Sequence, residues 1–219
     1  MSCRINIVCG GPADPDFVAA YLKKQPVDLL IAADRGLDTC LLAGVTPDIV
    51  LGDYDSTGMR SRLDEMKTMG VFVEVYPAEK DFTDTEAAIR CALDRGADDI
   101  ALLGATGGRL DHFLANLDLM LLPLRRGVRC AIVDERNVIR LLDTGVRLSA
   151  DEVSGKYISL RPFTQRVTGV TLTGMKYPLR GAVLTKGSTL GISNEMTGSV
   201  AEVAFDEGIM ILVVSDDAG

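Results

Sequence analysis

The sequence lacks several features that would assign it to a common functional class. No segment approaches the roughly 18 uninterrupted apolar residues that a membrane span requires, so no membrane partner is expected. Lys and Arg number 23 against 31 Asp and Glu, the formal net charge is −8, and no Lys/Arg stripe is present. Binding of nucleic acid or of an anionic membrane depends on neutralising phosphates. We therefore expect neither partner, and an anionic substrate would need a metal ion to bridge it to the protein.

The cysteines lack the spacing of a redox or zinc motif. There are five of them, an odd number, without a C-x-x-C pair, and most lie among apolar neighbours. This usage is typical of reduced, buried thiols. The start, "MSCRINIVCGG", has no positive region followed by a long apolar core, so no signal peptide is expected. Together these features predict a cytoplasmic protein.

Short apolar runs alternate with helical periodicity through the first part of the chain. Near-continuous apolarity is typical of strands covered on both faces, as in a parallel sheet. The segments between these runs have helical spacing, and several stop at a glycine, which is favoured just after a helix. The pattern predicts a doubly wound, mostly parallel α/β domain over residues 1–127. The apolar runs are "RINIVCG", "VDLLIAAD", "PDIVLGD", "VFVEVYP" and "DDIALLGA", and the glycines are Gly44, Gly70, Gly96 and Gly127.

The pattern of apolar and polar residues changes at about residue 128. Segments such as "KYISLRPF", "RVTGVTLTGM" and "IMILVVSDD" are short, alternating and rich in β-branched residues, with turn signals at "DTG" and "DEG". No amphipathic helix is evident there. We expect residues 128–219 to form an all-β domain, a sandwich or a small barrel.

Acidic residues follow several of the expected parallel strands. Asp34 ends the second run, Asp53 and Asp55 follow the third, and Asp84 lies in "EKDFTDTE" after the fourth. Ligands of open α/β sheets bind beyond the carboxyl ends of the strands. Clustered carboxylates repel one another unless a cation joins them, and few oxygen ligands with room for phosphate suit Mg²⁺. We therefore interpret Asp53 and Asp55 as metal ligands, although an Asp-x-Asp alone also fits a turn.

Two neighbouring features admit structural interpretations as well. Thr83 and Glu86 have the spacing of a helix capping box, and Asp84 would suit the helix N-terminus electrostatically. His112, the single histidine, lies at an expected helix start and could be a general base or a structural residue.

Glycines dominate the turn after the fifth strand. Gly104, Gly107 and Gly108 could simply form a strand-to-helix turn, but glycine-rich backbone at a helix start also holds phosphate, and Arg109 offers a bidentate partner. The order G-x-x-x-x-G-K-[ST] is absent, so "TKGSTLG" is not a P-loop. "GISNE" could be an ordinary hairpin loop.

Taken in order, five stretches resemble the bacterial thiamine pyrophosphokinases. They are "AADRG", "GDYDS", "EKDFTDTEAA", "GATGGRLDH" with Asn116 following, and "KGSTLGISNE". The resemblance implies an α/β domain followed by a β-sandwich. It also implies a Mg²⁺-dependent reaction in which ATP and thiamine give thiamine diphosphate and AMP.

The resemblance carries functional residues over in three groups. The metal and ATP-phosphate group is Asp53, Asp55 and Asp84, with Asp34 nearby. The contacts to the nucleotide phosphates and the reacting centre are Thr83, Gly104, Gly107, Gly108, Arg109 and Asp111. Ser193 and Asn194 correspond to the thiamine site, which the family completes between the two kinds of domain in a homodimer. Eukaryotic members stack thiamine on a tryptophan, and this chain has none, so a Phe or Tyr must replace it.

Three other functions remain as alternatives. A pyrophosphokinase acting on a pterin alcohol would keep the nucleotide side and change the acceptor pocket. A phosphatase using Asp53 as nucleophile would need neither ATP nor a second domain. A non-enzymatic nucleotide or thiamine sensor would have no need of catalytic carboxylates.

Overall fold

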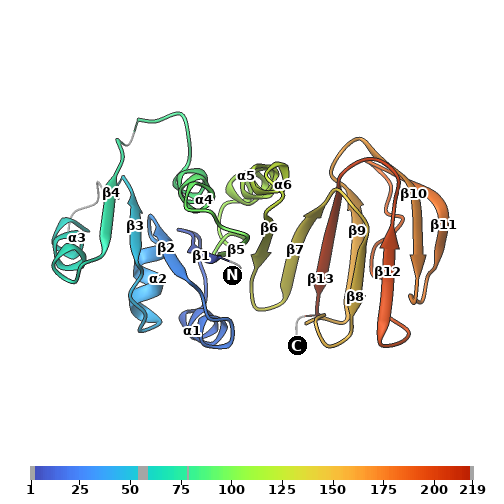
Figure 1. The fold of residues 1–219 in the computed structure, drawn as a ribbon, viewed down its shortest axis with the longest axis horizontal. Helices are drawn as coiled ribbons and strands as arrows, with labels where there is room; N and C mark the ends of the chain where they lie inside the picture. The colour runs from blue at the N-terminus through green and yellow to red at the C-terminus, as the bar shows by residue number, and fades with distance from the viewer. Residues whose placement is uncertain (1–2, 54–58, 78, 218–219) are drawn as a thin grey trace. The chain divides into compact units, whose positions relative to one another are not determined.

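The computed structural model describes residues 3–53, 59–77 and 79–217. Six strands of the first part form one sheet: β1 (Arg4–Val8), β2 (Leu29–Ala33), β3 (Ile49–Gly52), β4 (Phe72–Val75), β5 (Asp99–Leu103) and β6 (Arg129–Val133). Their order is β4-β3-β2-β1-β5-β6, and each neighbouring pair is parallel (Figure 1). This arrangement confirms the predicted doubly wound α/β domain.

Helices cover both faces of this sheet, which explains the continuous apolar runs in its strands. They are α1 (Pro15–Lys24), α2 (Gly36–Leu42), α3 (Met59–Thr68), α4 (Asp84–Asp94), α5 (Leu110–Leu119) and α6 (Leu121–Arg125). In Figure 1, α1 and α2 lie on one face, and α4, α5 and α6 lie on the other. In the described part of the chain, no helix has the length and apolarity that a membrane crossing needs.

The helix ends follow from local sequence. Gly44, Gly70, Gly96 and Gly127 all have positive φ, between 69° and 84°, as expected for residues that terminate helices. The last helical segment is divided, because α5 ends at Leu119 and α6 begins at Leu121. Pro123 accounts for the break, since its ring conflicts with the carbonyl four residues earlier and it has no N–H to donate.

The strand order reverses between β1 and β5. Parallel α/β sheets bind ligands at such a point, where the two loops leave in opposite directions. Here the loops approach closely, with the Gly11 N–H donating to the Gly104 carbonyl at 3.1 Å. A Cβ on Gly11 would lie 2.4 Å from that oxygen, so the approach requires glycine.

The second part of the chain is an antiparallel β-sandwich. Its strands are β7 (Asn137–Leu142), β8 (Val146–Ser149), β9 (Tyr157–Pro162), β10 (Arg166–Thr173), β11 (Leu179–Thr185), β12 (Val200–Ala204) and β13 (Met210–Ser215). One layer has the order β7-β13-β9 and the other β11-β10-β12-β8. Side chains of both layers, among them Leu160, Leu212, Val170 and Val203, form a single buried core. The expected all-β architecture is confirmed.

The chain divides into two compact units, Met1–Asp134 and Glu135–Gly219. The division therefore falls a few residues after the change of sequence pattern. The difference is β6, which pairs in parallel with β5 and belongs to the first unit. Its short sequence "RCAIV" has the same texture as the strands that follow it, so pattern alone does not separate them.

Candidate active site

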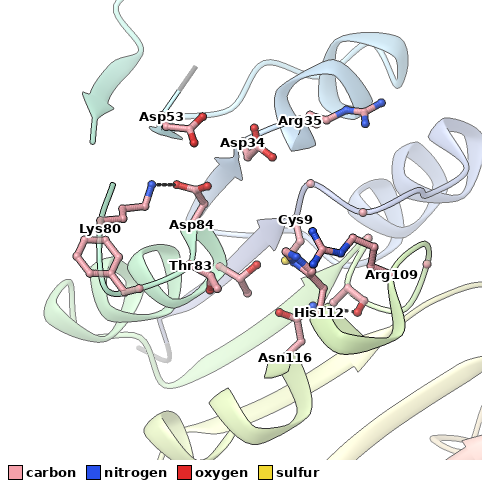
Figure 2. A pocket seen from close by; sticks show the side chains of 17 residues that line it. Cys9, Asp34, Arg35, Asp53, Lys80, Thr83, Asp84, Arg109, His112 and Asn116 are labelled. Carbon is pink, nitrogen blue, oxygen red and sulfur yellow. Dashed lines mark hydrogen bonds and ion pairs between the residues drawn. The ribbon is translucent and has the colours of Figure 1, made fainter. Parts of the chain in front are cut away.

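A cleft of about 480 Å³ lies beyond the carboxyl ends of the parallel strands (Figure 2). The loops after β1, β2, β3 and β5, the segment before α4 and the first turns of α4 and α5 form its walls. The candidate residues that line it are Asp34, Asp53, Thr83, Asp84, Gly104, Gly107, Arg109 and His112. The fold thus brings most of the predicted group together.

Three carboxylates, those of Asp34, Asp53 and Asp84, face this cleft (Figure 2). Asp34 directly follows β2 and has a φ of 51°, a left-handed conformation that Asp tolerates better than most residues. Burial raises the pKa of the Asp34 carboxyl, the backbone N–H of Arg35 opposes this, and the charges of Asp84 and Asp53 raise it further. The neighbouring carboxylates thus repel one another, and a bound cation would relieve this repulsion.

Lys80 is a cleft residue that our sequence analysis overlooked. Its ammonium lies 2.9 Å from Oδ1 of Asp84, with side-chain exposures of 9% and 19% (Figure 2). The Nζ atom also lies 5.5 Å from the ring centre of Tyr76 and 5.9 Å from that of Phe82. The predictions for "EKDFTDTE" concern its carboxylates and its helix cap. Lys80 precedes α4, so its contact with Asp84 depends on the fold of a non-helical segment and is not visible in the spacing.

The carboxylates of the cleft suit a magnesium ion that is coordinated jointly by the protein, by water and by substrate phosphate. Asp55 lies outside the described residues. Within the described ranges, no three His, Cys, Asp or Glu side chains form a closed metal site. Mg²⁺ usually takes one or two protein carboxylates and completes its shell with water and substrate phosphate. Asp34, Asp53 and Asp84 fit a metal bound in this way, and they do not form a site made of protein ligands alone.

Thr83 serves as a helix cap and as a cleft residue. Its hydroxyl accepts a hydrogen bond from the Glu86 N–H at 3.1 Å, at the N-cap of α4. The Glu86 carboxylate binds Arg90, at 2.7 Å, one turn along the same helix. Thr83 therefore caps α4, as its spacing predicted, and the same residue lines the cleft.

The glycine turn after β5 brings backbone against backbone. Gly104 and Gly108 have φ values of 66° and 82°, and a Cβ on Gly104 would lie 2.9 Å from the Cys9 carbonyl oxygen. Gly107 lines the cleft, and a Cβ on Gly108 would approach Pro12 to 3.1 Å. Glycine is therefore required for the fold of this turn, whatever the turn binds.

Arg109 and Asp111 form a bidentate ion pair at the start of α5. The two nitrogen–oxygen distances are 3.1 and 2.5 Å, and the side chains are 73% and 63% exposed. The hydrogen bonds from Arg109 hold the pKa of the Asp111 carboxyl below its usual range. Arg109 lines the cleft, whereas its partner Asp111 is not one of the lining residues.

Two further α5 residues line the cleft. The His112 backbone N–H donates to Oδ1 of Asp111 at 3.0 Å. Asn116, 7% exposed, donates from Nδ2 to the Ala105 carbonyl at 3.0 Å. This bond joins α5 to the glycine turn, so Asn116 supports the shape of that wall.

Cys9 offers no nucleophile to the cleft that it lines. Burial raises the pKa of its thiol to about 12, despite an opposing hydrogen bond with Thr85. The thiolate is the reactive form of cysteine, and it is not populated near neutral pH at such a pKa.

Ser193 and Asn194 lie in the second unit, in the connection between β11 and β12. Ser193 has a φ of 55°, and its N–H donates to the Ser159 hydroxyl at 3.0 Å. Asn194 is 2% exposed, and its Oδ1 accepts from the N–H groups of Tyr177 and Glu195 at 2.9 and 3.0 Å. Its Nδ2 donates to the Tyr177 carbonyl at 2.8 Å. Asn194 therefore fixes the backbone beside Tyr177, whose side chain is 58% exposed.

Comparison with known proteins divides the chain in the same way. Residues 20–132 match the family described as "Thiamin pyrophosphokinase, catalytic domain". Residues 144–210 match "Thiamin pyrophosphokinase, vitamin B1 binding domain". The first match contains the three carboxylates of the acidic cleft, and the second contains the Ser193–Asn194 loop.

Individual relatives agree with the family matches. The chain is 38% identical over 215 residues to a thiamine pyrophosphokinase of Bacillus subtilis, covering 97% of this chain and 99% of that protein. The crystal structure of thiamine pyrophosphokinase from Bacillus subtilis superposes with a TM-score of 0.86 at 37% identity, covering 98% and 100% of the two chains. That from Geobacillus thermodenitrificans gives 0.84 at 36% identity, covering 99% of each. The chain therefore belongs to the thiamin pyrophosphokinase family, and thiamine pyrophosphokinase is its activity.

Proposed function

We propose that the acidic cleft of the first unit binds ATP with Mg²⁺, and that the thiamine hydroxyl attacks the β-phosphorus there and expels AMP. The observation that carries this proposal is the convergence of Asp34, Asp53 and Asp84 in one cleft, which is also lined by the loops after β1 and β5, where the strand order reverses. No covalent nucleophile is needed, because phosphoryl chemistry depends mainly on positioning and charge stabilisation.

In this proposal Asp53 and Asp84, with Asp55, hold magnesium, and Asp34 lies beside them. When bound, the metal neutralises charge around the β-phosphorus and the departing α-phosphate. The proximity of the three carboxylates supports the proposal. Besides burial, the charges of Asp84 and Asp53 raise the pKa of Asp34, and a cation bound among them would offset this repulsion.

The phosphates would lie against Thr83, the glycine turn (Gly104, Gly107 and Gly108) and Arg109. The N-cap residue of α5, Arg109, makes no side-chain capping bond, and the His112 N–H of the first turn already donates to Asp111. A phosphate would therefore meet the other N–H groups of this helix start. Arg109 is already oriented by Asp111 and can offer a bidentate contact to phosphate oxygens. Asp111 would then steady Arg109 and orient the alcohol or the metal.

Thiamine would bind at the Ser193–Asn194 loop of the second unit, inside the segment that matches the vitamin B1 binding domain. Thiamine is an aromatic cation, and Tyr177 presents an exposed ring beside that loop. We propose that Tyr177 supplies the aromatic contact in this tryptophan-free chain and that Asn194 acts by holding Tyr177 in place.

We further propose a homodimer in which the α/β unit of one subunit and the β unit of the other complete the thiamine site. The loop alone is an open surface, so a second wall is needed to exclude water from the reacting alcohol. Sedimentation should give a dimer, and a fully active monomer would contradict the shared site.

A cytoplasmic location also belongs to the proposal. All five cysteines are free, and Cys9, Cys40, Cys91 and Cys130 are buried. Free thiols in this number are usual where disulfides are kept reduced.

The acceptor is tested by offering thiamine and a pterin alcohol separately, with ATP and Mg²⁺, and measuring AMP. We expect AMP with thiamine only. AMP formed with the pterin alcohol alone would assign the acceptor pocket to the alternative pyrophosphokinase. Binding of both substrates without any product would make the protein a sensor.

A further inference from the structure

Lys80 places a fixed positive charge inside the acidic cleft. Its side chain is 9% exposed, its ammonium is 2.9 Å from Oδ1 of Asp84, and the rings of Tyr76 and Phe82 lie close to the same nitrogen. A long amphipathic stem held by aromatic rings loses little further freedom when its ammonium binds an anion. Lys80 is therefore a preorganised cation of the site.

The other cations that line the cleft are placed differently. Arg109 is 73% exposed and paired with Asp111. The Arg35 guanidinium is directed away from the three carboxylates (Figure 2). Among the described lining residues, Lys80 thus provides the cation in contact with an acidic residue that we assign to magnesium.

The pair creates a competition for one carboxylate. An Asp84 carboxylate that accepts from the Lys80 ammonium is less available to a metal ion, because both partners draw on the same negative charge. A metal that takes Asp84 would release the ammonium at the edge of the site where the phosphates of ATP arrive. A released lysine ammonium is a suitable point charge for phosphate oxygens.

We propose that Lys80 is a displaceable counter-ion of Asp84: it holds the carboxylate while the cleft is free of metal, and it transfers to a polyphosphate oxygen when magnesium–ATP binds. This inference rests on the proposed function, specifically on Asp84 as a magnesium ligand. It predicts two opposite effects in a variant without the ammonium. The bare metal ion should bind more tightly, and the metal–nucleotide complex should bind more weakly.

Lys80→Met is the informative variant. Methionine keeps an unbranched apolar stem beside Tyr76 and Phe82 and removes the charge. Arg90→Met is its matched control, because it removes an ion pair of the same i,i+4 spacing, Arg90 with Glu86, outside the cleft on α4. Lys80→Gln also removes the charge and serves if the methionine variant fails to fold, and Lys80→Arg is a second control that retains the charge.

Two binding measurements test the proposal without turnover. Mn²⁺, a spectroscopically visible substitute for Mg²⁺, is titrated into nucleotide-free protein and followed by electron paramagnetic resonance. Binding of the magnesium complex of α,β-methylene-ATP, which resists cleavage at that bridge, is followed by calorimetry. We expect Lys80→Met to bind Mn²⁺ several-fold more tightly and the nucleotide complex roughly tenfold more weakly, the size of one lost charged hydrogen bond.

Arg90→Met should match the wild type in both titrations, and Lys80→Arg should retain weak Mn²⁺ binding. If Lys80→Met weakens both ligands alike, Lys80 merely supports the loop and the proposal is overturned. Unchanged binding of both ligands would overturn it as well. Asp84→Asn separates the premise from the inference: unchanged Mn²⁺ binding in that variant would reject Asp84 as a metal ligand, whereas a loss there leaves Lys80 to be judged on its own variants.

Discussion

The carboxamide of Asn194 binds the backbone of Tyr177 in both directions, accepting from its N–H at 2.9 Å and donating to its carbonyl at 2.8 Å. The side chain thereby takes the place of a neighbouring strand for one residue. Because Asn194 is 2% exposed, solvent does not compete for its carboxamide in the folded protein. The residue thus links the proposed thiamine loop to the exposed aromatic ring.

Asn194→Ala should therefore raise the KM for thiamine far more than the KM for ATP. It removes support from a part of the site that does not react, and it leaves buried backbone groups unpaired at a cost of about 1–3 kcal/mol in the free energy of unfolding. Ser193→Ala and Tyr177→Ala should show the same selectivity in KM, while Tyr177→Phe keeps the ring and stays near the wild type. Steady-state kinetics with each substrate varied in turn provide the measurement, and equal effects on both KM values would indicate a loop that closes over the whole site.

Asp53→Asn and Asp84→Asn should lower turnover by orders of magnitude while the fold persists. Each replacement keeps the size of the side chain and removes a charge proposed to hold magnesium. Asp55→Asn is expected to behave alike. Circular dichroism and turnover at saturating Mg²⁺ check the two parts of the prediction, and a variant with near-normal turnover would lose its place among the metal ligands.

Asp34 should make the protein less stable as the pH rises from acidic to neutral. Burial and the charges of Asp84 and Asp53 raise its pKa, so the folded protein holds this proton more tightly than the unfolded chain does. The stability contributed by the proton is present below the ordinary carboxyl pKa and is lost as the pH passes through the raised value. Asparagine also tolerates a φ of 51°, so Asp34→Asn should keep the backbone. The variant should therefore be more stable than the wild type near neutral pH and should lose that advantage in acid.

Urea unfolding of both proteins at acidic and neutral pH measures this difference. Asp34→Ala is the control, because it removes the same charge but suits the left-handed backbone poorly. A gain in stability for Asp34→Asn that is equally large in acid would show that the proton is not its source.

Much of the fold follows from sequence because its determinants are local. Gly44, Gly70 and Gly96 mark helix ends through their left-handed φ, and the buried parallel strands are visible as apolar runs. The pairing of β6 with β5 joins residues far apart in the sequence. The local sequence pattern therefore groups β6 with the later strands. The break between α5 and α6 could have been expected from Pro123.

The candidate site is less completely visible in the sequence. The carboxyl ends of parallel strands meet at one edge, which is why Asp34, Asp53 and Asp84 could be grouped without a structure. The contacts of Lys80 and Asn194 could not be predicted in this way, because they depend on which partners the fold places against these side chains. A buried asparagine bound to distant backbone and an exposed one look identical in a sequence.

Gly104→Ala should disrupt the close contact between the loop after β1 and the loop after β5. Its Cβ would lie 2.9 and 3.0 Å from the carbonyl oxygens of Cys9 and Gly11, in a backbone with a φ of 66°. Gly127→Ala is the matched control, with a φ of 69° and no atom within 4 Å of the added Cβ. The control should cost only the backbone strain, about 1–2 kcal/mol in the free energy of unfolding, and Gly104→Ala should cost more and weaken nucleotide binding. Equal losses in the two variants would show that the close approach is unimportant.

The position of bond breaking tests the central claim most directly. Thiamine labelled with oxygen-18 in its hydroxyl is incubated with ATP, Mg²⁺ and the protein, and the products are resolved by mass spectrometry. We predict AMP and thiamine diphosphate in equal amounts, no accumulation of ADP, and the label in the ester bridge to the former β-phosphorus, because the acidic cleft is proposed to stabilise charge at the β-phosphorus and the departing α-phosphate. Stoichiometric ADP with thiamine monophosphate would contradict the account, and phosphate release without ATP would favour a phosphatase.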